Sequence, residues 1–284
     1  MRWFFALNAE CMSFGHYAEM IQVAVWTARR HTRLQPHFLY HGEDDPPVLE
    51  WLRNHGAEVW RARSRFYEEL CALEHDLKKP DARTCGGGAY LRLEIIDLLA
   101  QHGIRDRHIL YTDCDVMFQQ DPEPLLRRQP CRFIACGPES QRGNPVDMNT
   151  GVLLMNVARL RRLNREFLAF ARSELKTSIS WAMDQHAYKQ FFRAALPPRS
   201  WPWVRGWNML PDELNWKPYW GENPSAPILH FHGPKPMHRE WLKTAPETHI
   251  LKHFSGGAYQ LYTDRWLAVR DEIWAEGKTA AASA

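Results

Sequence analysis

Short apolar runs alternate with longer stretches of helical period over about the first 110 residues, and this alternation restricts the fold more than any other feature of the chain. The apolar runs lie at residues 3–7, 37–40, 58–60 and 108–111, with helical patterns at about 17–30, 47–54 and 89–101 between them. Strands that alternate with helices in this way build βαβ units around a parallel sheet. The sequence therefore predicts an α/β fold.

The second half of the chain carries fewer regular signals. Further strands are expected at 133–135, 151–156 and 228–232, and helices from about Ala158, from Met183 and over 264–275. Residues 196–227 are rich in proline and tryptophan without periodicity, which is typical of a long ordered loop with a functional role. Since no repeat or domain-sized linker interrupts the chain, we expect one domain over residues 1–275 and a flexible tail at 276–284.

The charge balance and the cysteines limit the class of partner and the compartment. Lys and Arg number 36 against 33 Asp and Glu, a formal net charge of +3, which gives no support for a nucleic-acid partner. No stretch reaches the ~20 apolar residues of a membrane helix, and the opening apolar run is too short for a signal peptide. The six cysteines are scattered without a C-x-x-C pair, which predicts reduced thiols and a cytoplasmic location.

Two carboxylates, those of Asp113 and Asp115, directly follow the apolar run at 108–111. On extended backbone, a spacing of two points both carboxylates to the same side. Ligands of open α/β sheets bind at the carboxyl ends of strands, and paired carboxylates there suit a divalent cation bound to a diphosphate. A single D-x-D triplet also arises by chance in a chain of this composition, so the motif needs support from other residues.

A second polar cluster occupies residues 228–238, where His230 and His232 share one face of an expected strand that ends in a Gly-Pro turn. An imidazole is able to complete a metal site begun by two aspartates. Gly233 permits a close backbone approach, and Lys235 supplies a point charge for a phosphate. The alternative interpretation is that these are structural histidines beside a turn.

Several other positions admit both a binding role and a purely local one. Asn149, followed by Thr150 at the start of an expected strand, is placed either to bond a ligand hydroxyl or to make an Asx-turn. Asp184, followed by Gln185, opens an expected helix, where the helix dipole alone favours a carboxylate. The glycines at 86–88 match no phosphate-binding pattern, so a mobile hinge is favoured over a phosphate cradle.

Taken in order, five segments resemble the motifs of glycosyltransferase family 8, the retaining GT-A enzymes that include glycogenin and bacterial lipopolysaccharide galactosyl- and glucosyltransferases. The family's Y-x-R-L helix resembles residues 90–93, its L-Y-x-D-x-D motif residues 110–115, and its F-N-A-G-V-L-L-x-N strand residues 148–156. Its D-Q-D motif resembles residues 184–186, and its H-F-x-G-x-x-K-P-W motif residues 230–237. The resemblance implies a GT-A fold, with a Rossmann-like nucleotide-binding core and a mixed central sheet flanked by helices.

The resemblance also implies a role for each matching residue. The metal ligands would be Asp113, Asp115 and His230, which match the family's Mn²⁺ site, with Mg²⁺ as the alternative ion. The implied donor contacts are Ala6 and Asn8 at the uracil, Arg92 near the sugar and the diphosphate, Asn149 and Thr150 at the donor sugar, and Gly233 and Lys235 at the diphosphate, with Cys114 as a further donor-binding residue. Asp184 and Gln185 fall where the family has its reactive-face carboxylate and amide.

The implied function is that of a metal-dependent retaining enzyme that transfers a hexose from a UDP-sugar to a glycan or glycolipid acceptor such as lipopolysaccharide. Residues 1–120 would form the nucleotide-sugar half, and residues 121–275 the sugar and acceptor half. The cation would stabilise the departing diphosphate, and Asp184 or Gln185 an oxocarbenium-like transition state. Because an amide is a poor nucleophile, a same-face route with Gln185 as electrostatic stabiliser is favoured over a covalent intermediate.

The sequence departs from the family pattern at several positions. The turn from Gly233 to Lys235 is one residue shorter, Met237 replaces a tryptophan, and His186 replaces the second acid of D-Q-D. His232 competes with His230 as a metal ligand, although the H-x-x-G spacing favours His230. The acceptor side is suggested only by a group of aromatic residues that suits either sugar stacking or a hydrophobic lid, and by a loose match at Asn208; the aromatic residues are Trp201, Trp203, Trp207, Trp216, Tyr219 and Trp220.

Two rival functions remain compatible with the sequence. A catalytically silent protein that binds a sugar nucleotide or a glycan would keep the same fold. Metal-dependent phosphohydrolases also use a D-x-D motif, but their D-x-D-x-[TV] pattern requires Thr or Val where Met117 stands and usually lies on the first strand. No segment demands a membrane, whereas basic or aromatic surface patches would allow peripheral contact with one.

Overall fold

A mixed sheet of seven strands forms the centre of the molecule in a computed structural model that describes residues 1–78, 81–144, 146–194 and 206–282. The strand order is β3-β2-β1-β4-β7-β6-β8. The strands of this sheet are β1 Arg2–Asn8, β2 Gln35–His41, β3 Glu58–Arg61, β4 His108–Thr112, β6 Ile134–Pro138, β7 Met148–Asn156 and β8 Trp207–Met209. The predicted α/β class and the mixed sheet flanked by helices are therefore confirmed.

The first four strands are parallel, and the sheet changes direction at β7. Strand β1 pairs in parallel with β2 and β4, and β2 pairs in parallel with β3. Strand β7 then runs antiparallel to both β4 and β6. As a result, the carboxyl end of β4 and the start of β7 meet at one edge of the sheet. The start of β4 and the end of β7 meet at the opposite edge.

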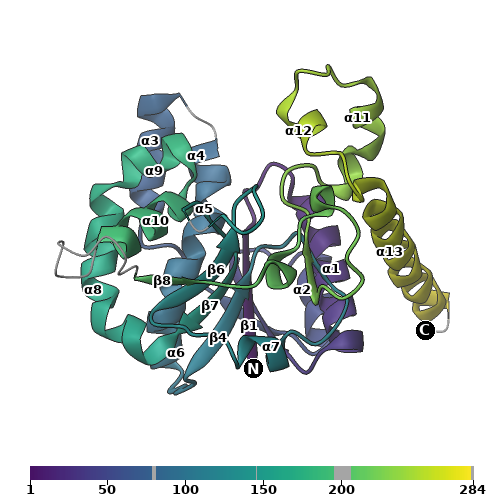
Figure 1. The fold of residues 1–284 in the computed structure, drawn as a ribbon. Coiled ribbons are helices and arrows are strands. Elements are labelled where there is room, and N and C mark those ends of the chain that lie inside the picture. Colours follow the sequence, from purple (N-terminus) through teal and green to yellow (C-terminus); the bar gives the residue numbers. More distant parts are fainter. Residues whose placement is uncertain (79–80, 145, 195–205, 283–284) are drawn as a thin grey trace.

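Helices cover both faces of the sheet (Figure 1). Side chains of β1 alternate between the two layers: Phe4 and Ala6 belong to the apolar cluster on one face of the sheet, whereas Trp3, Phe5 and Leu7 belong to the cluster on the other face. The helices are α1 Phe14–His31, α2 Pro47–Asn54, α3 Tyr67–Leu77, α4 Asp81–Thr84, α5 Gly86–Ala89, α6 Ile95–Gln101, α7 Glu123–Leu126, α8 Val157–Ser173, α9 Leu175–Trp181, α10 Asp184–Ala194, α11 Arg239–Thr244, α12 Ile250–His253 and α13 Tyr259–Ala282. Short 3₁₀ turns are η1 Tyr90–Glu94, η2 Asp212–Asn215, η3 Pro218–Trp220 and η4 Pro236–His238.

A second, two-stranded sheet joins β5 Val116–Phe118 to β9 Ile228–His230. The pairing is antiparallel and sets Val116 opposite His230. A third apolar cluster lies beneath it, where Leu229 packs with Met20 of α1 and with Trp266 of α13. The small sheet therefore brings two segments more than a hundred residues apart in sequence next to each other.

Three regions differ in detail from the sequence expectations. The glycines at 86–88 lie buried in the short helix α5, packed against β1, and do not form an open joint. Within the expected loop 196–227, the described part contains β8, η2 and η3, and residues 196–205 lie outside the described residues. Helix α13 begins before the expected 264 and continues past the expected 275 to Ala282.

Among the described residues, none of the helices combines the length and the apolar character that a membrane crossing requires.

Candidate active site

A cavity of about 330 Å³ opens at the edge of the sheet where β1 and β4 end and β7 begins. Eleven of the thirteen residues predicted for the site line it: Ala6, Asn8, Arg92, Asp113, Cys114, Asp115, Asn149, Thr150, Asp184, Gln185 and Lys235. The remaining two are His230, which lies against Asp115, and Gly233, which adopts a positive φ of 85° in the turn after β9. The structure thus gathers residues from six separate segments of the sequence.

Asp113, Asp115 and His230 form a compact group of potential metal ligands. Each offers one ligand atom, and these three atoms lie within 4.8 Å of one another. Asp113 is held where β4 ends by a hydrogen bond from its backbone N–H to the Gly151 carbonyl, 2.8 Å. His230 reaches Asp115 because β9 pairs with β5, the strand that begins one residue after Asp115. Two carboxylates and an imidazole are a donor set that divalent transition metals accept.

The imidazole of His230 is oriented for metal binding. Its Nδ1 lies 2.8 Å from the amide oxygen of Asn215, so Nδ1 carries the proton and the lone pair of Nε2 is directed to Asp115 Oδ1, 3.3 Å away. Burial lowers the pKa of His230, which favours the neutral ring that binds metals. The ring packs on Gly151, where an added Cβ would lie only 2.2 Å from His230 Cε1. A side chain at position 151 would displace the ring.

The carboxylate of Asp115 is almost fully buried and faces positive groups. Burial by itself would raise the pKa of Asp115, but the adjacent Lys235 and His230 outweigh it and lower the pKa. The ammonium of Lys235 contacts Asp115 Oδ2 and donates to the Phe231 carbonyl, 2.9 Å. Asp115 Oδ1 has no hydrogen-bond partner among the described residues. A buried carboxylate oxygen without such a partner fits a cation ligand.

His232 points away from this group. Its Nδ1 lies 2.8 Å from the Tyr219 hydroxyl, and its Nε2 lies 2.9 Å from Glu139 Oε1. Both ring nitrogens are therefore engaged, and the ligand group contains His230 and not its neighbour. The side-chain directions therefore agree with the H-x-x-G spacing, which favours His230 over His232.

A buried ion pair between Arg92 and Asp184 forms one wall of the cavity. Arg92 Nη2 donates to Asp184 Oδ1 over 2.8 Å, its Nε contacts Asp184 Oδ2, and its Nη1 donates to the Thr150 carbonyl over 2.7 Å. The side chains are 5% and 1% exposed. The guanidinium also lies 3.8 Å from Asp113 and stacks on Tyr111 at 4.7 Å. Since Arg92 uses both carboxylate oxygens of Asp184, we interpret Asp184 first as the group that positions Arg92.

Glu139, a residue that the sequence analysis did not identify, joins the opposite wall. Its Oε2 accepts from Gln185 Nε2 over 2.8 Å and from Asn149 Nδ2 over 3.2 Å. The amide oxygen of Gln185 accepts from the Thr150 backbone N–H, 2.8 Å. Burial would raise the pKa of Glu139, but the hydrogen bond and charge of His232 lower it to about 2. Glu139 follows the short strand β6, and a lone glutamate after a strand carries no motif that sequence reasoning can use.

Ala6, Asn8 and Cys114 form the floor where β1 ends. Cys114 Sγ donates to the Ala6 carbonyl, 3.2 Å, and burial raises the pKa of its thiol well above the ordinary value, which disfavours a nucleophilic role. Asn8 Oδ1 is buried without a hydrogen-bond partner among the described residues. Helix α5 packs on Asn8 so closely that a Cβ at Gly87 would lie 2.7 Å from Asn8 Nδ2. The glycines thus allow this contact.

None of the described aromatic residues expected on the acceptor side lines the cavity, and Tyr219 comes nearest through its hydroxyl contact with His232. Trp207 and Trp216 are buried in the apolar clusters, and the Trp220 indole donates to the Ser140 carbonyl, 2.6 Å. Asn208 does not line this cavity, because its side chain accepts a hydrogen bond from the backbone N–H of Arg132, which precedes the start of β6. The tryptophans at 201 and 203 lie outside the described residues.

Solved structures with a similar fold are glycosyltransferases. The chain is similar to the galactosyltransferase LgtC, solved in complex with donor and acceptor sugar analogs, with 15% identity, a TM-score of 0.62 and 96% of each chain covered. It is also similar to the glycosyltransferase GlyE of Streptococcus pneumoniae TIGR4, with 16% identity and a TM-score of 0.58 over 97% of this chain and 64% of that one. This protein has the fold of solved glycosyltransferases.

A third similar structure is mouse xyloside xylosyltransferase 1, with 13% identity and a TM-score of 0.53 over 81% of this chain and 96% of that one. The chain spans less than two thirds of the length of GlyE. No family model and no curated protein matches the sequence. The GT-A fold implied by the five sequence motifs is confirmed, and at these identities the likeness concerns the fold.

Proposed function

We propose that this protein is a metal-dependent retaining glycosyltransferase that transfers a hexose from a UDP-sugar to a glycan or glycolipid acceptor. The observation that carries the proposal is the group formed by Asp113, Asp115 and His230 at the edge of a cavity in a glycosyltransferase fold. Nearly all the other residues that the motif resemblance assigns to the donor line the same cavity. These residues come from distant parts of the sequence, and a shared site is the simplest reason for their convergence.

The three ligand groups suit a divalent cation, either Mn²⁺ or Mg²⁺. His230 presents Nε2 because Asn215 fixes its other nitrogen, and Asp115 presents a buried oxygen that has no hydrogen-bond partner among the described residues. A bound cation would act as the Lewis acid that offsets negative charge on the leaving diphosphate. Asp113, whose side chain is 38% exposed, is the ligand nearest to solvent and therefore to an incoming donor.

Positive side chains add to the stabilisation of the leaving group. Arg92 is held at the cavity wall by Asp184, and Lys235 extends from the turn after β9 to Asp115. Because the whole chain carries a formal charge of only +3, the positive potential at the site has to come from these local groups. In this proposal Lys235 exchanges its contact with Asp115 for the diphosphate when the donor binds, and Gly233 lets the turn approach it.

Gln185 is proposed to stabilise the oxocarbenium-like transition state with its amide oxygen, and Asn149 with Thr150 to hold the donor sugar. Retention of configuration would then follow a same-face route. Asp184 is engaged by Arg92, so its use as a covalent nucleophile would require that ion pair to break. Glu139 positions the amides of Gln185 and Asn149 from the other side.

Ala6, Asn8 and Cys114 are proposed to contact the uracil and ribose side of the donor. Residues 1–120 would then form the nucleotide-sugar half, and residues 121–275 the sugar and acceptor half. All six cysteines are free, which suits work in the reducing cytoplasm, where UDP-sugars are also used. The acceptor is proposed to be a saccharide, including lipopolysaccharide, and a lipid-linked acceptor would bring the protein to the inner face of a membrane.

The test is release of UDP from a panel of UDP-sugars with Mn²⁺, with Mg²⁺ and with a chelator. We expect slow hydrolysis of one donor that requires the metal and is lost in Asp115→Asn. A matched control is Asp44→Asn, an exposed aspartate outside the cavity that should retain full release. The anomeric configuration of the transferred sugar, measured by NMR, then tests retention.

Other outcomes discriminate against the proposal. Metal-dependent UDP binding with no release from any donor, even with saccharide acceptors present, would indicate a binding protein. Absence of UDP binding in the presence of either metal would refute the assignment of the donor cavity. Release of inorganic phosphate instead of UDP would indicate a phosphohydrolase.

A further inference from the structure

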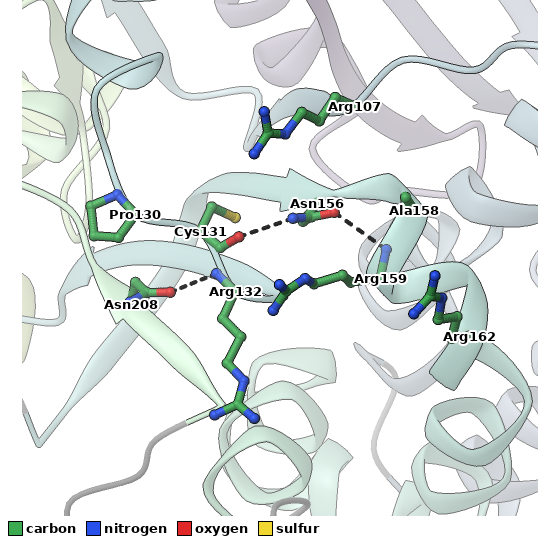
Figure 2. Close-up of a pocket in the computed structure, with 9 residues that line it drawn as sticks. All are labelled: Arg107, Pro130, Cys131, Arg132, Asn156, Ala158, Arg159, Arg162 and Asn208. Carbon is green, nitrogen blue, oxygen red and sulfur yellow. Dashed lines mark hydrogen bonds between the residues drawn. The ribbon is translucent and has the colours of Figure 1, made fainter.

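Four arginines surround a second depression on the molecule, with a volume of about 630 Å³ (Figure 2). Arg107 precedes β4, Arg132 precedes β6, and Arg159 and Arg162 lie in the first two turns of α8. Figure 2 shows Arg107 on one side of the depression and the two α8 arginines approaching from another. Three separate segments of the chain therefore contribute positive charge to one hollow.

None of these guanidinium groups forms an ion pair in the part of the chain that the structure describes. Every Asp and Glu side chain of the sequence lies within that part, because residues 79–80, 145, 195–205 and 283–284 contain no acidic residue. The nearest acid in sequence, Asp106, is already paired with Arg2 at 2.6 Å. The positive charge of the depression is thus left uncompensated by the chain itself.

The side-chain amides of Asn156 and Asn208 hold the backbone around the depression and do not engage the guanidinium groups of the arginines. Asn156 is 7% exposed and caps α8 by accepting from the Arg159 backbone N–H, 3.3 Å, and its Nδ2 donates to the Cys131 carbonyl, 3.0 Å. Asn208 accepts from the Arg132 backbone N–H, 2.7 Å. The positive end of the 17-residue helix α8 adds to the field of the arginines. Like charges held together in this way repel one another, and a bound anion relieves that repulsion.

The depression lies at the opposite edge of the sheet from the donor cavity. Asn149, near the start of β7, lines the cavity, and Asn156, at the end of β7, lines the depression. Strand β4 runs antiparallel to β7 between the same two sites. At about 3.3 Å per residue, the two sites are separated by roughly 20 Å. A ligand of the depression therefore does not reach the reaction centre, and its role differs from that of the donor.

We propose that this depression is a binding site for a phosphate group, carried either by an anionic lipid headgroup or by a soluble phosphorylated compound. The planar fork of arginine matches phosphate oxygens in geometry and charge, and several arginines from separate segments are a typical phosphate site. The volume suits a ligand larger than the ion alone. The site would hold the protein to a phosphate-bearing surface or molecule while the donor cavity, at the other edge, stays open.

The test compares the full chain with the double variant Arg159→Gln/Arg162→Gln. Cosedimentation is measured with vesicles of phosphatidylcholine alone and with vesicles that also contain phosphatidylglycerol, and calorimetry is measured with inorganic phosphate. The matched control, Arg165→Gln/Lys176→Gln, removes two exposed charges from helices α8 and α9 outside the depression. Both binding assays contain a chelator, so the metal group does not contribute to them, whereas release of UDP is measured with Mn²⁺.

Binding to phosphatidylglycerol vesicles but not to phosphatidylcholine, weakened roughly thirtyfold in the double variant and unchanged in the control, would support the site with a lipid as the source. Binding of inorganic phosphate without vesicle binding, lost only in the double variant, would support it with a soluble ligand as the source. Equal binding by the double variant, equal loss in the control, or no binding of either probe would overturn the proposal. Release of UDP by the double variant should equal that of the wild type, which separates this site from the donor cavity.

Discussion

The ion pair between Arg92 and Asp184 gives the sharpest prediction about stability at the cavity. The change Asp184→Asn keeps the shape of the side chain but removes the buried partner of the Arg92 guanidinium, 5% exposed, and leaves only the partly exposed Asp113, 3.8 Å away, as an opposite charge. Removal of one partner from a buried pair costs about 3–5 kcal/mol, since the remaining charge stays out of water. At 2–4 °C per kcal/mol for a chain of this size class, the melting temperature should fall by roughly 10 °C.

Thermal and urea unfolding, followed by circular dichroism, would measure this effect. The matched control is Glu69→Gln, which breaks a half-exposed pair with Arg172 at 3.0 Å and should cost less than about 1 kcal/mol. The double variant Arg92→Met/Asp184→Leu should recover most of the loss, because neither buried charge of the pair remains. The reasoning would be refuted if Asp184→Asn unfolded within 1 kcal/mol of the wild type, or if the double variant were less stable than the single one.

Three further predictions concern single side chains around the site. Gly151→Ala should weaken Mn²⁺ binding at least about tenfold in calorimetry, since its Cβ would lie 2.2 Å from His230, whereas Gly15→Ala, with no atom within 4 Å, should bind normally. Burial lowers the pKa of Lys217 to about 7, below its unfolded value of 10.5. Between these two pH values the unfolded chain binds more protons than the folded one, so the free energy of unfolding should rise with pH from 7 to 10. The urea midpoint of Lys217→Met should not show this rise. The pKa of Glu139 is lowered to about 2, against 4.5 in the unfolded chain, so its ionised form contributes stability above pH 4.5 that is lost as the pH falls toward 2. In Glu139→Gln the free energy of unfolding should therefore fall less steeply between pH 4.5 and pH 2. An unchanged pH dependence in this variant would contradict the assignment.

Most of the fold could be predicted from local pattern. The seven predicted apolar runs coincide with strands of the structure, and six of these strands are buried over most of their length, which makes them continuous apolar segments, whereas β3 is partly exposed. Strands β5 and β8 were missed, since each has only three residues and gains its stability from pairing rather than from its own sequence. The hinge expected at 86–88 is a packed helix, because the need for glycine comes from the approach of Asn8, which lies far away in the chain.

The sequence by itself determined the α/β class, the D-x-D motif after β4 and the order of five motifs, because these depend on residue type and short spacing. Only the tertiary structure decided which histidine lies against Asp115, since that depends on the pairing of β5 with β9 and on the direction of two rings. The engagement of Asp184 by Arg92, the position of Glu139 and the four arginines at the far edge were likewise decided by contacts across long stretches of chain. The sequence pattern indicates which chemistry a residue is able to perform, whereas its burial and its contacts determine the role that it takes. Burial and contacts arise only when distant segments of the chain pack together.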